Sequence, residues 1–209
     1  MSARGKRANP YKRPDPFTRA AKARGYPARS VFKLEEIDRR LRLLRAGQRV
    51  LDLGAAPGSW SMYAAQKVGA RGSVLAVDLS AITAALGPNV RAIEGDALAL
   101  GSALYAESGP FDVVLSDMAP ATTGTRDADQ ARSHELFMAA LSIAREHLTP
   151  GGAFVGKIFM GGDFPLAKEG VRLAFEEVRV LRPEGTRTSS FEVFLVGLRR
   201  RRAAPGGNA

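Results

Sequence analysis

The sequence predicts an α/β protein with a mostly parallel, seven-stranded sheet, an antiparallel last strand and helices on both faces. The chain contains seven short apolar runs, and helix-like stretches alternate with them. Such alternation is typical of a parallel sheet covered by helices. The last two runs are joined only by "EGTRTSS", which is too short for a helical crossover. These two runs should therefore form an antiparallel hairpin at the end of the sheet.

The elements can be assigned in chain order. Leu34, Ile37, Leu41 and Leu44 recur on one helical face, and Gly47 is expected to end this first helix. The strand runs are "QRVLDLG", "SVLAVDLS", "NVRAIEGD", "FDVVLSD", "GAFVGKIF", "EVRVLRP" and "FEVFLVGLR". Further helices are expected to begin near Trp60, Ala97, Asp127 and Phe164.

The length of 209 residues suits one domain with short extensions. We expect a basic, disordered extension over residues 1–14, a single domain over 15–198 and a flexible basic tail over 199–209. The chain has no cysteine and only two histidines, so neither a disulfide nor a metal site is predicted.

No apolar run approaches the roughly 20 residues that a membrane helix needs. The first residues are too basic and too poor in apolar side chains for a secretory signal. These features predict a cytoplasmic protein with no membrane partner. No exposed apolar stripe suggests a dimer, so a monomer is expected.

Positive charge is concentrated at the two ends of the chain. The first 33 residues hold ten basic residues against one acid, and Arg199–Arg202 form a second basic run, while the remainder is slightly acidic. Aromatic residues lie among the N-terminal charges, which favours nucleic acid as the partner of that segment. For the C-terminal run alone, a nucleic-acid contact and a merely solubilising tail are equally consistent with the sequence.

Charged residues stand at or near one end of several predicted strands. They are Asp52, Asp78, Asp96, Asp117, Lys157 and Glu192. The carboxyl ends of parallel strands and the start of an antiparallel one lie at the same edge, so these groups should converge there. Lys157 lies inside the apolar stretch "GGAFVGKIFMGG". Burying its amine is costly unless another interaction offsets the loss of hydration.

The loop "DLGAAPGSW" follows the first strand and leads into a helix. Gly54 and Gly58 allow the backbone to approach a ligand closely. Neither the dinucleotide pattern G-x-G-x-x-G nor a phosphate-binding G-x-x-x-x-G-K-S/T loop is present. Asp78 is placed to accept hydrogen bonds from ribose hydroxyls, and Asp52 could receive an ammonium group. S-adenosylmethionine fits these features, because it is a nucleoside with an amino-acid tail and no pyrophosphate.

Five segments resemble the FtsJ (RrmJ) family of RNA 2'-O-ribose methyltransferases. They are "FKLEEID", "DLGAAPGSW", "LSDMAP", "GGAFVGKIF" and "FEVFLV", and they occur in the family's order from about Asp15 to Leu198. The resemblance implies a Rossmann-like methyltransferase fold that uses S-adenosylmethionine. It also implies a large-subunit (23S) ribosomal RNA substrate, with a uridine as the modified nucleotide.

The resemblance further implies the site residues. The family's Lys-Asp-Lys-Glu catalytic tetrad falls on Lys33, Asp117, Lys157 and Glu192. Its cofactor contacts fall on Gly58, Trp60, Asp78, Asp96 and Asp117. Ser59 departs from the pattern, since bacterial members commonly carry a second glycine there.

A ribose hydroxyl is a weak acid, so methyl transfer to it needs positioning and removal of a proton. Desolvation in an apolar strand and a second nearby cation both favour a neutral lysine amine, which suits Lys157 as the general base with Lys33 close by. Asp117 would orient Lys157. In an alternative role, a charged Lys157 directs the hydroxyl lone pair while the proton leaves later to water.

Three other functions are alternatives to the methylation of ribosomal RNA. Transfer RNA is an alternative substrate, because contacts with phosphates carry little sequence information. A non-catalytic RNA-binding assembly factor could keep this fold, although the complete tetrad argues against it. A small-molecule methyltransferase is disfavoured by the charge asymmetry.

Overall fold

The computed structural model describes residues 15–184, 186 and 190–202. The extension predicted for residues 1–14 lies outside these described residues, as does most of the C-terminal tail. Among the described residues, no helix has the length and apolar character needed to cross a bilayer.

All seven predicted strands are present in one sheet. The strands are β1 (Arg49–Leu53), β2 (Ser73–Asp78), β3 (Val90–Glu94), β4 (Phe111–Ser116), β5 (Leu148–Phe159), β6 (Phe175–Leu181) and β7 (Glu192–Arg200). Their order is β3-β2-β1-β4-β5-β7-β6. Strands β1 to β5 pair in parallel, whereas β7 runs antiparallel between β5 and β6. The predicted sheet and its terminal hairpin are therefore confirmed.

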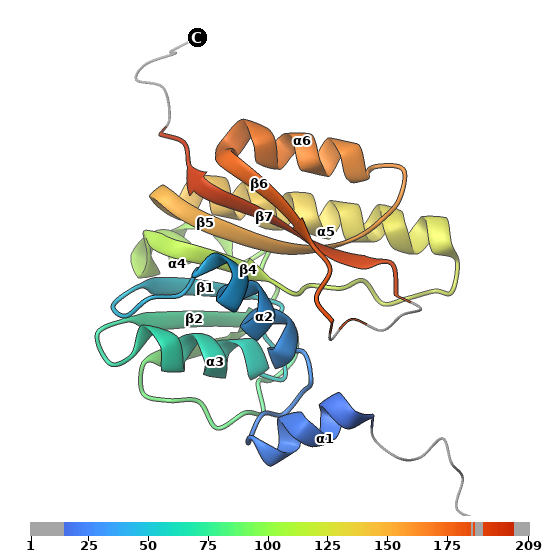
Figure 1. The fold of residues 1–209 in the computed structure, drawn as a ribbon. Coiled ribbons are helices and arrows are strands. Elements are labelled where there is room, and N and C mark those ends of the chain that lie inside the picture. Colours follow the sequence, from blue (N-terminus) through green and yellow to red (C-terminus); the bar gives the residue numbers. More distant parts are fainter. Residues whose placement is uncertain (1–14, 185, 187–189, 203–209) are drawn as a thin grey trace, which may run out of the picture.

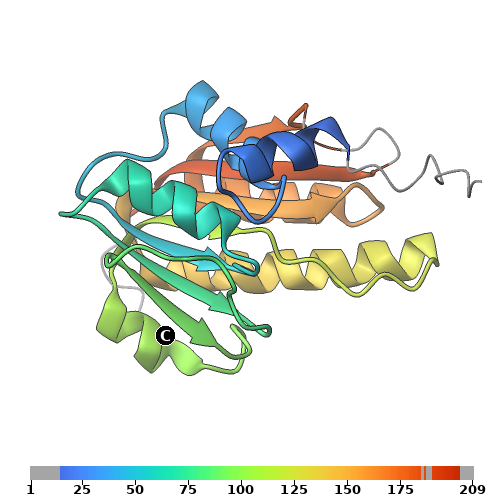
Figure 2. The same ribbon diagram turned by 90° about the horizontal axis from the view of Figure 1, so that it is seen from below.

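Helices cover both faces of this sheet (Figures 1 and 2). They are α1 (Pro16–Ala23), α2 (Val31–Leu41), α3 (Ser59–Val68), α4 (Gly101–Ser108), α5 (Arg126–His147) and α6 (Phe164–Ala174). One apolar core lies under α2 and α3, and a second lies under α4, α5 and α6. Successive strand residues point into the two cores in turn, because side chains alternate across a strand.

The first predicted helix ends earlier than expected. The sequence pattern placed its end at Gly47, but α2 stops at Leu41 because Arg42 adopts a left-handed conformation with φ of 53°. The Asp38 carboxylate then accepts a hydrogen bond from the Leu44 amide at 2.9 Å. Leu44 is still buried. The apolar repeat therefore predicted the burial of Leu44 correctly, but it predicted too long a helix.

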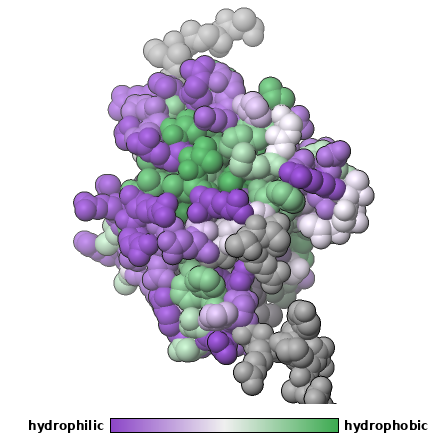
Figure 3. Space-filling model, turned by 45° about the vertical axis from the view of Figure 1, so that its right-hand side comes forward, coloured by the Kyte–Doolittle hydropathy of each residue, from purple (hydrophilic) through white to green (hydrophobic). Residues whose placement is uncertain are grey.

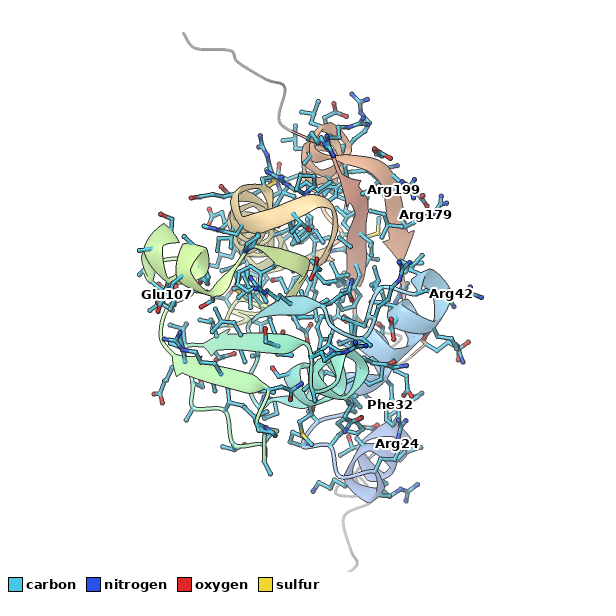
Figure 4. All side chains as sticks on the ribbon, turned by 90° about the vertical axis from the view of Figure 1, so that its left-hand side faces the viewer. Arg24, Phe32, Arg42, Glu107, Arg179 and Arg199 are labelled. Atoms are coloured by element: carbon cyan, nitrogen blue, oxygen red, sulfur yellow. The ribbon has the colours of Figure 1, made fainter. Side chains whose placement is uncertain are left out.

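Helix α1 was not predicted, and the structure explains how so short a helix forms. The Asp15 carboxylate caps its first turn, accepting hydrogen bonds from the Thr18 amide and hydroxyl, and Pro16 occupies the first helical position. The Arg24 guanidinium then pairs with both carboxylate oxygens of Glu35 at 2.8 and 3.0 Å. Arg24 also lies over the Phe32 ring, 5.4 Å from its centroid (Figure 4). These contacts fix α1 against α2.

The segment between α1 and α2 is attached to helix α3. The Ser59 hydroxyl accepts a hydrogen bond from the Ala28 amide at 2.8 Å and donates one to the Ala28 carbonyl at 3.1 Å. The Trp60 indole donates to the Ser30 carbonyl at 2.8 Å. Because α3 begins immediately after the glycine loop, these bonds join the loop to the segment that leads into Lys33.

Candidate active site

Two glycines shape the loop between β1 and α3. Gly54 has φ of 75°, and a Cβ there would lie 2.9 Å from the Met118 backbone. Gly58 has φ of 111°, and a Cβ there would lie 2.6 Å from the Ala84 side chain. Both positions therefore require glycine, for backbone conformation and for close packing. The loop consequently lies directly against the segment that follows β4.

A cavity of about 290 Å³ opens beside this loop. Its lining residues are Gly54, Ala56, Val77, Asp78, Leu79, Asp96, Ala97, Leu98, Asp117, Met118, Ala119 and Leu136. These residues come from the carboxyl ends of β1, β2 and β4, the residues following β3, and one face of α5. The cavity thus lies at the edge where a parallel sheet is expected to bind its ligands.

Backbone hydrogen bonds hold two of the cavity carboxylates in place. The Asp78 oxygens accept hydrogen bonds from the Ala56 amide at 2.9 Å and the Ser80 amide at 2.8 Å. One Asp96 oxygen accepts the Leu98 amide at 2.9 Å. Each carboxylate oxygen has a second lone pair, so the cavity presents oriented acceptors to the hydroxyls and amines of a ligand.

Three residues predicted to contact the cofactor are absent from the cavity lining: Asp52, Gly58 and Trp60. Asp52 is fully buried on the α3 face of β1 and accepts a hydrogen bond from the Ser61 hydroxyl at 2.6 Å. Trp60 is 2% exposed and packs against Phe194, with 5.7 Å between ring centroids. Its contact with Ser61 places the Asp52 carboxylate against the start of α3. Their predicted contacts with the cofactor stay predictions.

Burial dominates the electrostatics of Asp52. Loss of hydration raises the pKa of its carboxyl to about 7, and the negative charges of Asp117 and Asp78 act in the same direction. The hydrogen bond from Ser61 opposes this shift. Asp52 is therefore a carboxyl group that titrates near neutral pH immediately behind the cavity.

Sequence reasoning missed the apolar walls of the cavity. Leu79 is 72% exposed and Leu98 is 47% exposed, and both line the cavity next to the acids that follow β2 and β3. For Leu79 the available signal was a leucine directly after Asp78, the last residue of β2, since a position after a strand favours a polar turn residue. Such walls suit the flat, apolar face of a nucleobase.

Lys157 and Asp117 form the first of two ion pairs beside the cavity. The Lys157 amine lies 3.0 Å from the Asp117 carboxylate and also donates to the Asp117 backbone carbonyl. Lys157 is only 6% exposed, as the apolar stretch around it predicted. Asp117 lines the cavity as well, so one residue connects the ligand site with the buried lysine.

Lys33 and Glu192 form the second ion pair, with 2.5 Å between the amine and the carboxylate. Both side chains are nearly buried, at 13% and 11% exposure. The β5–β7 register pairs Lys157 with Phe194 and Phe159 with Glu192. The alternation of side chains therefore directs Lys157 and Glu192 to the same face of the sheet, the one covered by α2. Figure 3 brings the right-hand side of Figure 1, where this edge lies, toward the viewer.

Comparison with known proteins gives the family of the chain. The model of the FtsJ-like methyltransferase family matches residues 26–200. This chain belongs to the FtsJ-like methyltransferase family. The resemblance seen in the five sequence motifs is thereby confirmed, and with it the methyltransferase activity and its methyl donor, S-adenosylmethionine.

Relatives of this FtsJ-like methyltransferase are similar over nearly the whole chain. A protein from Sorangium cellulosum is 68% identical over 199 residues, which cover 95% of this chain and 94% of the relative. A protein from Anaeromyxobacter sp. is 49% identical, covering 97% of this chain and 76% of the relative. Both are named ribosomal RNA large subunit methyltransferase E.

Solved structures support the Rossmann-like methyltransferase fold. A Plasmodium falciparum chain provisionally described as a ribosomal RNA methyltransferase is 24% identical, with a TM-score of 0.71 over 84% of this chain and 98% of the other. Fibrillarin from Aeropyrum pernix with bound S-adenosylmethionine is 14% identical, with a TM-score of 0.54 over 75% of this chain and 68% of the other. The predicted fold class is confirmed.

The cavity fits S-adenosylmethionine by the chemistry of its lining. Asp78 and Asp96 offer oriented acceptors for ribose hydroxyls and an exocyclic amine, while Leu79 and Leu98 offer apolar walls for a base. Gly54 lines the cavity with backbone alone, since it has no side chain. Among the described residues, no group of three or more histidine or acidic side chains could hold a metal ion.

Proposed function

We propose that this methyltransferase transfers a methyl group to the 2'-hydroxyl of a ribose in large-subunit ribosomal RNA, with a uridine as the modified nucleotide. One observation carries the proposal: Asp117 lines the cofactor cavity and also holds the buried Lys157 amine. An acceptor hydroxyl placed at Lys157 would thus lie next to the methyl donor. The names of the 68% and 49% identical relatives support ribosomal RNA as the substrate.

The two ion pairs support distinct roles in this reaction. S-adenosylmethionine supplies an electrophilic methyl group when it is bound. Asp117 orients the Lys157 amine through two oxygen acceptors, and a third direction on the nitrogen remains for the substrate hydroxyl. Lys157 would accept the proton of that hydroxyl as general base. Lys33, held by Glu192, would position the ribose from the α2 side.

A charged Lys157 could instead direct the lone pair of the hydroxyl without removing its proton. Replacement by arginine separates the two roles, because a guanidinium keeps a positive charge but cannot act as a base near neutral pH. We expect Lys157→Ala and Lys157→Arg both to lower turnover by ~10²–10⁴-fold, the usual contribution of a positioned base. Substantial turnover in the arginine variant would assign Lys157 to positioning alone.

The test is transfer of labelled methyl groups to unmodified large ribosomal subunits, to their extracted RNA and to transfer RNA. The modified nucleotide is mapped by the resistance of its 3' phosphodiester bond to alkaline cleavage. Lys168→Ala, an exposed lysine on α6, serves as the matched control. Label in transfer RNA alone would overturn the ribosomal substrate. Binding of S-adenosylmethionine without transfer to any RNA would overturn the RNA methyltransferase proposal.

A further inference from the structure

Two large apolar side chains lie exposed beside the tetrad. Phe191 immediately precedes Glu192 and is 47% exposed, and Met160 follows β5 and is 43% exposed. The Met160 amide donates a hydrogen bond to the Phe191 carbonyl at 2.9 Å, and the Gln130 side chain donates to the Met160 carbonyl at 2.6 Å. Backbone hydrogen bonds therefore hold this surface in place although much of it remains in contact with water.

Arg126, the first residue of α5, completes this surface. Its guanidinium carbon lies 3.9 Å from the centroid of the Phe191 ring, which is a cation–π contact. Among the described residues, no carboxylate forms an ion pair with Arg126, so its positive charge is not neutralised locally. We call Arg126, Met160 and Phe191 the aromatic platform.

The platform borders the tetrad from the side opposite Lys33. Glu192 points to the α2 face of the sheet, where it meets Lys33. Side-chain alternation along the strand direction turns the neighbouring Phe191 toward the other face, and its contact with Arg126 at the start of α5 agrees with this. Figures 1 and 2 show the start of α5, the end of β5 and the start of β7 together at one edge. A nucleotide at Lys157 would therefore lie between α2 and the platform.

We propose that the aromatic platform is a nucleobase-binding subsite for the RNA substrate. It would bind the base of the methylated nucleotide or of an adjacent one. The base stacks on Phe191 and Met160, while Arg126 supplies positive charge for a neighbouring phosphate. Exposed aromatic rings combined with arginine planes are the usual means of binding unstacked bases. This inference rests on the proposed function, since it takes RNA as the ligand.

The first test compares three variants of Phe191 with the wild type. Phe191→Ala removes the ring, Phe191→Leu keeps apolar bulk without a π face, and Phe191→Tyr keeps the ring. Stacking on an aromatic residue contributes ~1–3 kcal/mol per base, so the Ala and Leu variants should bind RNA about 5- to 150-fold more weakly. The Tyr variant should bind within about threefold of wild type. Leu166→Ala, on the exposed surface of α6, is the matched control and should leave RNA affinity unchanged.

Affinity for S-adenosylmethionine and the midpoint of thermal unfolding are measured for every variant. Both should match the wild type, because the platform is exposed and lies outside the cavity lining. Loss of RNA affinity in the leucine variant with normal unfolding excludes a general folding defect. Equal RNA affinity in the wild type, Ala and Leu variants would overturn the subsite.

A second test asks whether the ring acts on a base. RNA substrates carry an abasic nucleotide at the methylated position or at either neighbour, and binding is compared in a double-mutant cycle. At one of the three positions, removal of the base should weaken RNA binding by the wild type. The same removal should not weaken RNA binding by Phe191→Ala any further. Additive losses at all three positions would overturn the proposal. Methylation of RNA by the wild type in the same assays keeps this outcome separate from failure of the proposed function.

Discussion

At the scale of single residues, Asp117 has the most demanding position in the site. It lines the cavity beside the glycine loop, its carboxylate forms an ion pair with Lys157, and its backbone carbonyl accepts a hydrogen bond from the same amine. A lysine that is 6% exposed would be costly without such partners. Asp117 therefore supplies both of the contacts that offset the burial of this amine.

Asp52 makes stability depend on pH in an unusual direction. Burial raises the pKa of this carboxyl from 3.8 to about 7, so the folded protein binds its proton more tightly than the unfolded chain does. The contribution of Asp52 to stability is therefore fully present below about pH 4 and declines as the pH rises to about 7. Asp52→Asn cannot ionise, so its stability relative to the wild type should increase from pH 5 to pH 8.

Chemical denaturation of the wild type and Asp52→Asn at both pH values measures this change. Lys168→Ala again serves as a control, because its exposed side chain should leave the shape of the pH profile unaltered. Parallel pH profiles for the wild type and the Asn variant would show that Asp52 titrates normally in the folded protein.

At the scale of elements, Ser59 makes two of the hydrogen bonds that attach the segment before α2 to helix α3. Its buried hydroxyl makes both hydrogen bonds to Ala28, so Ser59→Ala leaves two backbone groups without these partners. Such losses cost about 1–3 kcal/mol. We expect lower thermal stability and faster tryptic cleavage at Arg24 and Arg29, because the segment should open more often. Ser102→Ala, on the exposed surface of α4, should change neither measurement.

A substitution at Gly54 tests how closely the glycine loop must approach the segment that follows β4. Alanine there would be strained by the positive φ and would place its Cβ 2.9 Å from the Met118 backbone. Since Met118 adjoins Asp117, we expect Gly54→Ala to weaken S-adenosylmethionine binding at least tenfold and to lower stability. Calorimetric titration measures the first effect. Gly69→Ala shares the positive φ but has no atom within 4 Å of the new Cβ, so it isolates backbone strain from steric contact.

The strands were predictable because their apolar runs end in charged residues, as in "AVDLS" and "VVLSD". The family motifs named Lys33, Asp117, Lys157 and Glu192, and the structure holds these four residues as two ion pairs; their catalytic roles stay a prediction. Helix α1 was not predictable in this way, because it has only two turns and its single buried residue is Ala21. The position of Trp60 also escaped prediction, since the entry of α2 beside α3 determines which way its indole faces.

At the scale of the whole molecule, the structure separates the members of the C-terminal basic run. Arg199 pairs with Glu176 at 2.9 Å and with Glu177 at 2.8 Å (Figure 4). Arg200, Arg201 and Arg202 instead line a cavity of about 520 Å³ with Arg145. Arg200 ends β7, and the end of β7 lies far from α1 in Figure 1. Positive charge is thus available at two separated places, as a large polyanion would require.

Salt dependence distinguishes RNA contact from a solubilising role for these arginines. If Arg200, Arg201 and Arg202 each contact a phosphate, their joint replacement by glutamine should reduce the slope of log affinity against log salt by about 2–3. The exposed set Arg39, Arg71 and Arg91, replaced in the same way, controls for net charge. Equal slopes in the two triple variants would favour the solubilising role.

The position of β7 in the sheet affects how the enzyme folds while it is being synthesised. Lys33 arrives early in synthesis and Glu192 late, and the last strand inserts between two that were made before it. Until β7 docks, β6 has no neighbour to pair with, and Lys33 lacks its ion-pair partner Glu192. Distant pairings of this kind form slowly. A nascent chain would therefore keep β6 and Lys33 without their partners until β7 has been made and has closed the sheet.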